Sequence, residues 1–426
     1  MNKTRLFKRS LLAVTVTLAT QQAMAAGFQL NAQSATGLGR AFAGDAVIAD
    51  NASVMARNPA AMALFDKTEL SLGFESITTM IEVKDAKYSS PLGTSTSIAD
   101  TDDVGSTSVA PNIHLIVPID EKFAVGVNAY TNFGTRTEFS SSYTASEYGG
   151  VTDVKSINFG LAGSYRLDEQ LSFGAGIDLI YGQGTLQRYA SSSSAALASY
   201  KLTNGASTTA VPAGTALVNI DGADGWAVGF NVGTVYELDE NNRFGFGYHY
   251  SPDFKAKDDY GQEITLPLPD IAEFSGFHKI EDTSFAVHYS VQWIGWSSFD
   301  KIEMRNLKSG SLAGTNYDKP YEWQDGWHYS LGGTYYLNSD WTLRAGYMYD
   351  TSAQDSVTSI SVPDSDRQWF SAGFTYAIDQ ASNVDFGFTY LLGDDVAVTE
   401  NSAGTTLTAT THADAILVGL QYSRSF

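Results

Sequence analysis

Apolar and polar residues alternate along most of the chain, from about residue 68 to the end. Phe123, Val125 and Val127, for example, alternate with small or polar residues. A period of two is the repeat of a β-strand, because successive side chains point to opposite faces. The pattern therefore predicts strands with one apolar face, and we find no comparable helical stripe. The same alternation recurs at residues 157–167, 171–179, 226–236, 285–293, 341–349 and 384–390.

The residues on the second face of these predicted strands show which of two fold classes is favoured, a membrane barrel or a soluble sandwich. It carries Gly, Ser, Thr and Asn with isolated charges such as Asp178, Arg344 and Asp385, and aromatic residues stand near the strand ends. Strands of about 10 residues with this pattern are typical of transmembrane β-barrels. Lipid offers no hydrogen-bond partner, so a spanning sheet must close on itself. We predict an all-β fold, a transmembrane antiparallel β-barrel, with a soluble secreted β-sandwich as the alternative.

The connections between the predicted strands alternate in length. Short turns are typical of the periplasmic side of outer-membrane barrels, and long loops are typical of the extracellular side. The chain ends on an aromatic residue, Phe426, in an alternating strand. Barrel-assembly machinery commonly recognises such a C-terminal signal. We therefore expect a multi-pass protein of the bacterial outer membrane. Tight turns are predicted at 167–170, 238–242, 337–340 and 379–383, and long polar segments at 76–108, 184–224, 251–283 and 297–325.

The first 25 residues predict a secretory signal peptide. Four basic residues precede an apolar run over residues 11–19, and Ala23-Met24-Ala25 has the small-x-small pattern of a cleavage site. The alternative, a membrane anchor, needs about 20 apolar residues, and this stretch is shorter and interrupted by Thr and Gln. Cleavage after Ala25 removes four positive charges.

Composition excludes several classes of function. The chain has 26 Lys and Arg against 47 Asp and Glu, a formal charge of −21, and the mature chain would carry 22 − 47 = −25. Nucleic-acid binding is disfavoured, because that affinity depends on Lys and Arg neutralising phosphates. The chain has no cysteine, which excludes disulfides, thiol catalysis, cysteine-ligated zinc and iron–sulfur clusters. We expect no cofactor and no metal.

Residues 26–67 break the alternation. This segment is rich in small residues and too polar to face lipid, so we expect it inside the barrel. Gly37, Gly39 and Gly44 superficially suggest a phosphate-binding loop. The third glycine of a dinucleotide fingerprint and the Lys-Ser/Thr of a P-loop are both missing, so nucleotide binding is disfavoured. The sequence thus divides into a signal peptide (1–25), a lumenal segment (26–67) and a barrel (68–426).

Several distinctive motifs are spread over nearly the whole mature chain. They are Ala26-Gly27-Phe28-Gln29-Leu30-Asn31, Gly37-Leu38-Gly39-Arg40-Ala41, Asn58-Pro59-Ala60, Asn132-Phe133-Gly134, Ser164-Tyr165-Arg166-Leu167, Tyr236-Glu237-Leu238-Asp239 and Pro363-Asp364-Ser365-Asp366-Arg367. In this order they closely resemble the FadL family of outer-membrane long-chain fatty-acid transporters. The resemblance implies a barrel of fourteen strands closed by an N-terminal plug, or hatch, and it implies transport of long-chain fatty acids.

The chemistry of a fatty acid predicts a site with two parts. The acyl chain gains about 0.8 kcal/mol per methylene on leaving water, whereas the carboxylate needs a basic partner when it is buried. Arg188 and Lys319 match family positions proposed to meet the ligand head group, with ordinary solvated loop charges as the alternative reading. Phe28 is expected to plug the pocket, with a packed core aromatic as the alternative.

The resemblance also assigns structural roles. Asn58-Pro59-Ala60 is expected to fix a hatch turn that blocks a direct channel. Gly134, in the third predicted strand, matches a family strand kink, and a glycine there permits a bulge. In the family such a kink is proposed to let ligand leave sideways through the barrel wall.

Three other functions remain open from the sequence. A lipid hydrolase is suggested by three His-Tyr-Ser tripeptides, but the period of two points His288 and Ser290 into the lumen, so we expect no enzyme. A general porin is compatible with the acidic charge but needs no plug. An importer of aromatic or other hydrocarbons is the main alternative, since a neutral ligand needs no cation. We expect a monomer whose partners are a long-chain fatty acid or similar ligand, outer-membrane lipid and the barrel-assembly machinery.

Overall fold

The computed structural model describes residues 27–426 except 90–94, 192–198, 202–207, 211–212, 309, 311 and 403–404. The predicted signal peptide, residues 1–25, therefore lies outside the described residues. Within the described part of the chain, no helix is long and apolar enough to cross a membrane.

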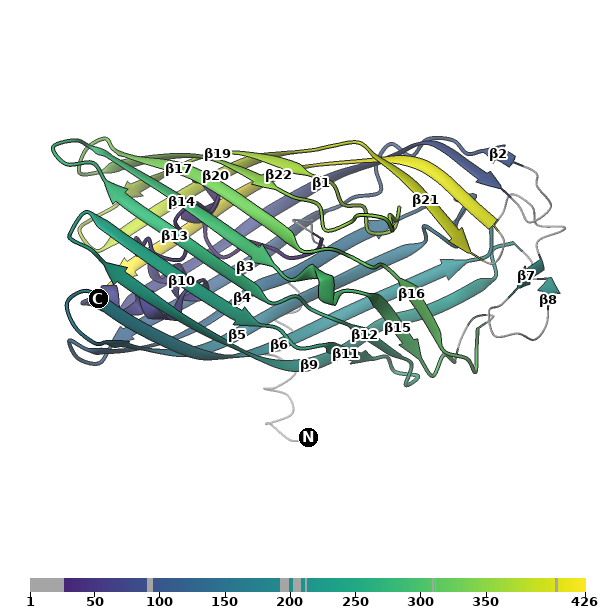
Figure 1. Cartoon of the computed structure of the whole chain (residues 1–426), viewed down its shortest axis with the longest axis horizontal. Coiled ribbons are helices and arrows are strands. Elements are labelled where there is room, and N and C mark those ends of the chain that lie inside the picture. Colours follow the sequence, from purple (N-terminus) through teal and green to yellow (C-terminus); the bar gives the residue numbers. More distant parts are fainter. Residues whose placement is uncertain are drawn as a thin grey trace.

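Fourteen long strands of the described chain form a closed antiparallel barrel (Figure 1). Each pairs with the next, and the last, β22, pairs with β1 from Glu69↔Ser425 to Ser89↔Thr406, so the sheet closes on itself. The predicted fold and strand number are confirmed. In order the strands are β1 (Glu69–Ser89), β3 (Thr107–Pro118), β4 (Phe123–Glu138), β5 (Val151–Arg166), β6 (Leu171–Tyr189), β9 (Ala216–Glu237), β10 (Asn242–Tyr250), β13 (Ile271–Lys279), β14 (Phe285–Ile294), β17 (Gly326–Tyr336), β18 (Trp341–Asp350), β19 (Arg367–Ala377), β20 (Ser382–Gly393) and β22 (Thr405–Ser425).

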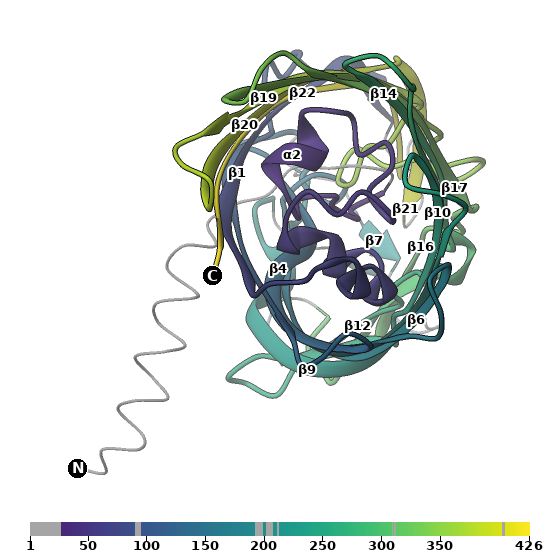
Figure 2. The same cartoon turned by 90° about the vertical axis from the view of Figure 1, so that its left-hand side faces the viewer.

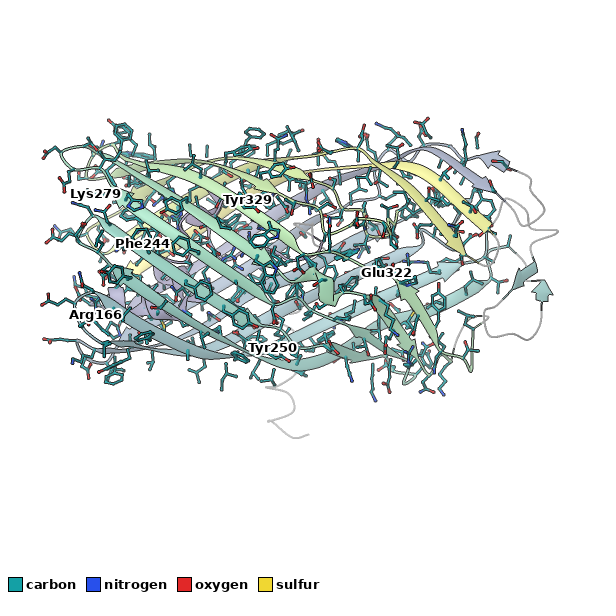
Figure 3. The ribbon with its side chains drawn as sticks, viewed as in Figure 1. Arg166, Phe244, Tyr250, Lys279, Glu322 and Tyr329 are labelled. Carbon is teal, nitrogen blue, oxygen red and sulfur yellow. The ribbon has the colours of Figure 1, made fainter. Side chains whose placement is uncertain are left out.

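The two faces of the wall follow the sequence alternation. Leu161, Ile177 and Trp226 are more than half exposed on the outside, where lipid would cover them. The side chains of Asp178 and Arg344 are buried in the lumen. Figure 3 shows this outer layer of side chains, with Arg166 and Lys279 at the end that carries the tight turns and Glu322 towards the other end.

Short strands and a 3-10 helix extend the wall at the end opposite the tight turns. All except β21 lie in or at the edge of the segments that the sequence assigned to extracellular loops, and several of them lie at the right of Figure 1. They are β2 (Ser95–Ser97), β7 (Ser199–Lys201), β8 (Thr208–Ala210), β11 (Phe254–Lys257), β12 (Glu263–Leu266), η3 (Trp296–Ser298), β15 (Lys301–Arg305), β16 (Tyr317–Pro320) and β21 (Val396–Ser402).

The predicted loop boundaries and the strand length of about 10 residues were partly wrong. The predicted loop at 251–283 contains the barrel strand β13, and β1, β6 and β9 run far into the predicted loops at 76–108 and 184–224. In β13 the inward residues Glu273 and Ser275 are polar, which made the strand resemble a loop. Where β6 rises beyond the apolar band, Gln183 and Gln187 replace apolar residues on its outer face, although its inner face stays buried.

Residues 27–67, here called the lumenal segment, lie inside the ring of strands (Figure 2). They form three short helices, each begun by a side-chain cap: Ser34 for α2 (Ala35–Leu38), Asn51 for η1 (Ala52–Ala56) and Asn58 for η2 (Pro59–Leu64). Most of the segment's side chains are buried against the wall. The position inside the barrel agrees with the absence of any two-residue period in this part of the sequence.

Candidate ligand-binding site

A cavity of about 300 Å³ lies among the extensions of the wall, away from the tight turns. Arg188 and Lys319, which the sequence selected from two separate predicted loops, both line it. Its walls also contain Leu186 and Met304. The volume is at the lower end of the ~300–1,000 Å³ range of small-molecule sites. The fold therefore brings the two predicted head-group residues to one cavity.

Arg188 stands near the end of β6, on its inward face. Its guanidinium donates to the carbonyl oxygens of Val151 at 2.7 Å and Gln187 at 2.9 Å, and to Thr152 Oγ1 at 2.8 Å. The residue is 5% exposed. Among the described residues, no carboxylate lies within salt-bridge distance of it. Arg188 is therefore a buried cation held in place by neutral acceptors.

Lys319 lies on β16, and its ammonium is also well coordinated. Nζ donates to Ser359 Oγ at 3.1 Å and to Ser361 Oγ at 2.9 Å, and lies 3.3 Å from Glu400 Oε2. Burial is the largest single influence and acts to lower the pKa of Lys319, but the charge of Glu400 and the nearby Tyr321 and Tyr317 together outweigh it, so that the pKa is raised. Lys319 is thus a cation at neutral pH.

Two acidic residues of the cavity were missed from the sequence. Glu400, on β21, pairs with Lys319 and accepts from the backbone N–H of Ile360 at 2.8 Å. Glu147 lies in the turn between β4 and β5 and accepts from Thr405 Oγ1 at 3.3 Å. Burial raises the pKa of Glu147 to about 7. Among 47 acidic residues, mostly in loops, nothing in the sequence marks these two.

An aromatic cluster leads from the cavity towards the lumenal segment. The Lys319 ammonium lies 5.1 Å above the ring of Tyr321, and Phe299 lies 5.1 Å from that ring between centroids. Phe28 then packs on Phe299 at 5.3 Å and on Trp296 at 4.6 Å. All belong to one buried apolar cluster that also includes Leu186 and Met304 of the cavity wall. Phe28 does not itself line the cavity; it is packed at the end of this cluster that belongs to the lumenal segment, with 2% of its surface exposed.

The chain around Phe28 also fills a break in the barrel wall. Pairing between β3 and β4 stops at Asn112↔Tyr130. Beyond that point residues 28–30 bind the edge of β4: Gly134 N donates to Phe28 O and Leu30 N to Asn132 O, both at 2.8 Å. The first residues of the lumenal segment thus occupy an edge that β3 leaves unpaired.

Strand β4 is irregular at the same place. The register against β5 shifts between Thr131 and Phe133, so that Asn132 is an extra residue, as in a β-bulge. The irregularity falls two residues before Gly134, the position that the resemblance singles out. Gly134 itself supplies the N–H that binds Phe28.

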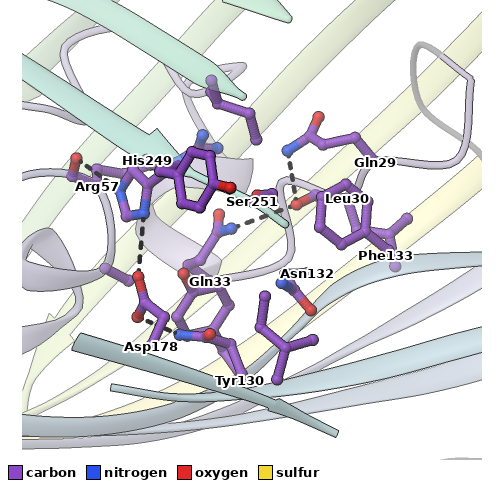
Figure 4. A pocket seen from close by; sticks show the side chains of 15 residues that line it. Gln29, Leu30, Gln33, Arg57, Tyr130, Asn132, Phe133, Asp178, His249 and Ser251 are labelled. Carbon is purple, nitrogen blue, oxygen red and sulfur yellow. Dashed lines mark hydrogen bonds and ion pairs between the residues drawn. The ribbon is translucent and has the colours of Figure 1, made fainter. Parts of the chain in front are cut away.

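A second, small cavity of about 30 Å³ lies between the lumenal segment and this part of the wall (Figure 4). Tyr130, Asn132 and Phe133 of β4 line it on one side, and Gln29 and Leu30 do so on the other. It has room for about one water molecule. Any larger molecule passing here needs the lumenal segment to move.

The Asn58-Pro59-Ala60 turn is fixed against the wall. Asn58 Oδ1 accepts from Ala60 N at 3.0 Å, and Asn58 Nδ2 donates to the carbonyl oxygens of Ala46 at 2.8 Å and Thr234 at 3.0 Å. The close approach depends on wall glycines. A Cβ added at Gly174 would lie 2.2 Å from Ala60 N. Only a glycine lets the turn lie so near the wall.

The histidines of the three His-Tyr-Ser tripeptides make their contacts elsewhere. His249 contacts the Arg57 carbonyl oxygen and His288 contacts Thr334, each through Nε2. His328 binds Asn31 and Asp350. Each histidine is therefore part of the packing between the lumenal segment and the wall rather than paired with the serine of its tripeptide.

These observations define a class of protein. A closed barrel with an apolar outer belt, whose lumen holds its own N-terminal segment and whose far end holds a small cavity, is an outer-membrane transport barrel rather than an open pore. Over residues 16–426 the chain matches the family described as Outer membrane protein transport protein (OMPP1/FadL/TodX), and it belongs to that family. The family resemblance predicted from the motifs is confirmed, and the protein is a multi-pass protein of the outer membrane.

Named relatives and solved structures agree with this placement. The chain is 34% identical to the "Long-chain fatty acid transport protein" of Escherichia coli O6:H1, covering 100% of each chain. It is 34% identical to "Outer membrane protein P1" of Haemophilus influenzae strain Rd, covering 99% of each. A crystal structure of a Pseudomonas aeruginosa FadL homologue has a TM-score of 0.82 at 21% identity, covering 94% of this chain and 100% of that one. The Pseudomonas putida toluene transporter TodX has a TM-score of 0.67 at 20% identity, covering 94% and 100%.

Proposed function

We propose that this protein carries long-chain fatty acids inward across the outer membrane without doing covalent chemistry. The observation that supports this most is the convergence of Arg188 and Lys319 on one cavity, two of whose apolar lining residues, Leu186 and Met304, belong to the same buried cluster as Phe28. A carboxylate would bind the two cations, and the acyl chain would leave water along the aromatic cluster. Relatives named for long-chain fatty acid transport, matched over the whole chain, support the same substrate.

In the proposed route, ligand enters the cavity from outside and then displaces Phe28. Residues 26–67 act as a hatch, with Asn58-Pro59-Ala60 holding the turn that blocks a straight channel. Moving residues 28–30 frees the edge of β4 beside Asn132 and Gly134, where pairing with β3 has stopped. Ligand would leave there into the outer-membrane lipid. We further propose that residues 1–25 are a cleaved signal peptide, that barrel-assembly machinery inserts the chain, and that it acts as a monomer.

The experiment compares oleate binding to the purified protein and to the double variant Arg188→Ala/Lys319→Ala. Removing the partners of a buried carboxylate costs about 2 kcal/mol or more, roughly 30-fold in affinity. The matched control is Lys255→Ala/Lys257→Ala, which removes two exposed cations from the same end of the barrel. Unchanged oleate binding in the first variant, with a folded barrel, would contradict the head-group assignment.

Import of a neutral hydrocarbon is the alternative, and the same variants test it. TodX, a structural neighbour, is described as a toluene transporter. A neutral ligand gains nothing from Arg188 and Lys319. Toluene uptake that exceeds oleate uptake and is indifferent to the double variant would favour the alternative.

A further inference from the structure

The cavity contains its own counter-charges. Four charged side chains line it: Arg188, Lys319, Glu147 and Glu400. With both acids ionised, the charges of the four sum to zero. A bound carboxylate would then bring the cavity to a net charge of −1, which is costly because Arg188, Lys319 and Glu400 are largely buried there. With one acid protonated, the same ligand leaves the cavity neutral.

The two acids are held differently. Glu400 is fixed as an anion by Lys319 Nζ at 3.3 Å and by the N–H of Ile360 at 2.8 Å. Glu147 has no cation within salt-bridge distance among the described residues, and its side-chain hydrogen bonds come from the neutral hydroxyls of Thr405 and Tyr88. Of the two, Glu147 is the one whose surroundings favour the protonated form.

The groups that face Glu147 come from four elements. Burial raises its pKa to about 7, hydrogen bonds from Tyr88 of β1 and Thr405 of β22 act to lower it, and the charge of Glu400 of β21 raises it further. Its own turn contributes Tyr143 and Tyr148, which are uncharged at neutral pH because burial raises their pKa. The Arg188 and Lys319 cations line the same cavity. A second anion in the cavity would therefore shift Glu147 towards its protonated form.

We propose that Glu147 takes up a proton when the cavity binds a carboxylate, while Glu400 holds Lys319 and competes with the ligand for it. The inference rests on the proposed function and adds to it that the head-group site binds a monoanion together with one proton. In this proposal the two acids, Glu147 and Glu400, help to determine which ligands bind, as do the two cations, Arg188 and Lys319. The proton comes from solvent and returns to it when the ligand leaves the cavity.

The direction of the pH dependence follows from the thermodynamic linkage between ligand binding and protonation of Glu147. If the ligand raises the pKa of Glu147, protonation must strengthen ligand binding by the same factor. The affinity for the ligand is then highest below pH 7. It falls as the pH rises through 7 towards the pKa that Glu147 has in the ligand-bound protein. If the pKa of Glu147 in the ligand-bound protein is at least about 8.5, we expect the affinity for the ligand to fall roughly fivefold or more between pH 6 and pH 8.

The test is calorimetry of the purified protein in detergent, in two buffers of different ionisation enthalpy. The ligand is an alkyl sulfonate, whose own charge does not change between pH 6 and 8, with oleate in parallel. We expect uptake of about half a proton or more per sulfonate at pH 7.5. Oleyl alcohol, a neutral ligand of the same length as oleate, should bind without proton uptake.

Two variants and a control separate the roles. Glu147→Gln should abolish proton uptake and flatten the pH profile, keeping the affinity that the wild type shows at pH 6. Glu400→Gln should bind sulfonate several-fold tighter at pH 8, because Lys319 loses its internal partner. Glu303→Gln, the same change on β15 outside the cavity lining, should behave like the wild type.

The outcomes distinguish this inference from the proposed function. Oleate binding that needs Arg188 and Lys319 but takes up no proton overturns the inference alone. Oleate affinity that is unchanged when Arg188 and Lys319 are both replaced overturns the proposed head-group site. If Glu147→Gln does not assemble, the proton count on the wild type and the Glu400→Gln affinity still decide the question.

Discussion

Replacing Gly174 by alanine should loosen the lumenal segment without disturbing the barrel. The added Cβ would lie 2.2 Å from Ala60 N and 2.3 Å from Pro59 C, whereas ordinary contacts begin at 3.4 Å. The turn must therefore move by about 3.4 − 2.2 = 1.2 Å, because backbone atoms cannot rotate away. Overpacking of this kind costs about 1–3 kcal/mol.

The movement also strains the hydrogen bonds from Asn58 Nδ2 to the carbonyl oxygens of Ala46 and Thr234. Each such bond contributes about 0.5–1.5 kcal/mol. Loss of both would bring the total to about 2–6 kcal/mol, enough to populate a displaced turn. Because β6 keeps its backbone pairing with β5 and β9, the barrel itself should assemble as before.

The assay is ion conductance of single proteins in planar lipid bilayers, with folding followed by migration of unheated samples in gel electrophoresis. Gly174→Ala should show new conductance steps. The control is Gly163→Ala on β5, where the added Cβ meets only Ala124 O at 3.9 Å. A folded Gly174→Ala protein as silent as the wild type would refute the idea that this contact holds the turn.

Two further predictions concern the hatch and the wall. Deleting residues 26–67 from the mature chain should leave a folded but leaky barrel, and a bilayer recording with no new conductance would argue against a plug. Deleting Asn132 should remove the bulge of β4, so that uptake of labelled oleate by cells falls while oleate binding to the purified protein stays within about twofold, because the head-group cavity is not touched. Equal loss of binding and uptake would instead point to general misfolding.

The period of two determined most of the barrel from the sequence alone. A strand in lipid must alternate, so Val125, Leu161 and Phe173 could be assigned to the outer face without any tertiary information. The same logic placed residues 26–67 in the lumen, since a segment that does not alternate and is too polar to face lipid must lie away from the membrane. It failed where strands rise beyond the membrane, because water accepts polar residues such as Gln183 on the outer face.

Only those site residues that match family positions or stand in a recognisable motif could be predicted from the sequence. Arg188 and Lys319 could be chosen because cations are scarce and these two match family positions, and Phe28 stands in a recognisable N-terminal run. Glu147, in a turn, and Glu400, on the extracellular strand β21, could not be chosen, because outside the membrane no local pattern distinguishes a solvated acid from a buried one.

Only the tertiary structure decided which distant residues share a space. The extensions of β6, β16 and β21 bring Arg188, Lys319 and Glu400 around one cavity, and the end of pairing between β3 and β4 gives residues 28–30 an edge to bind. Side-chain period is a local property of the chain, so sequence records it. Convergence of loops and a break in a sheet depend on contacts between segments far apart in sequence, and these exist only once the barrel has closed.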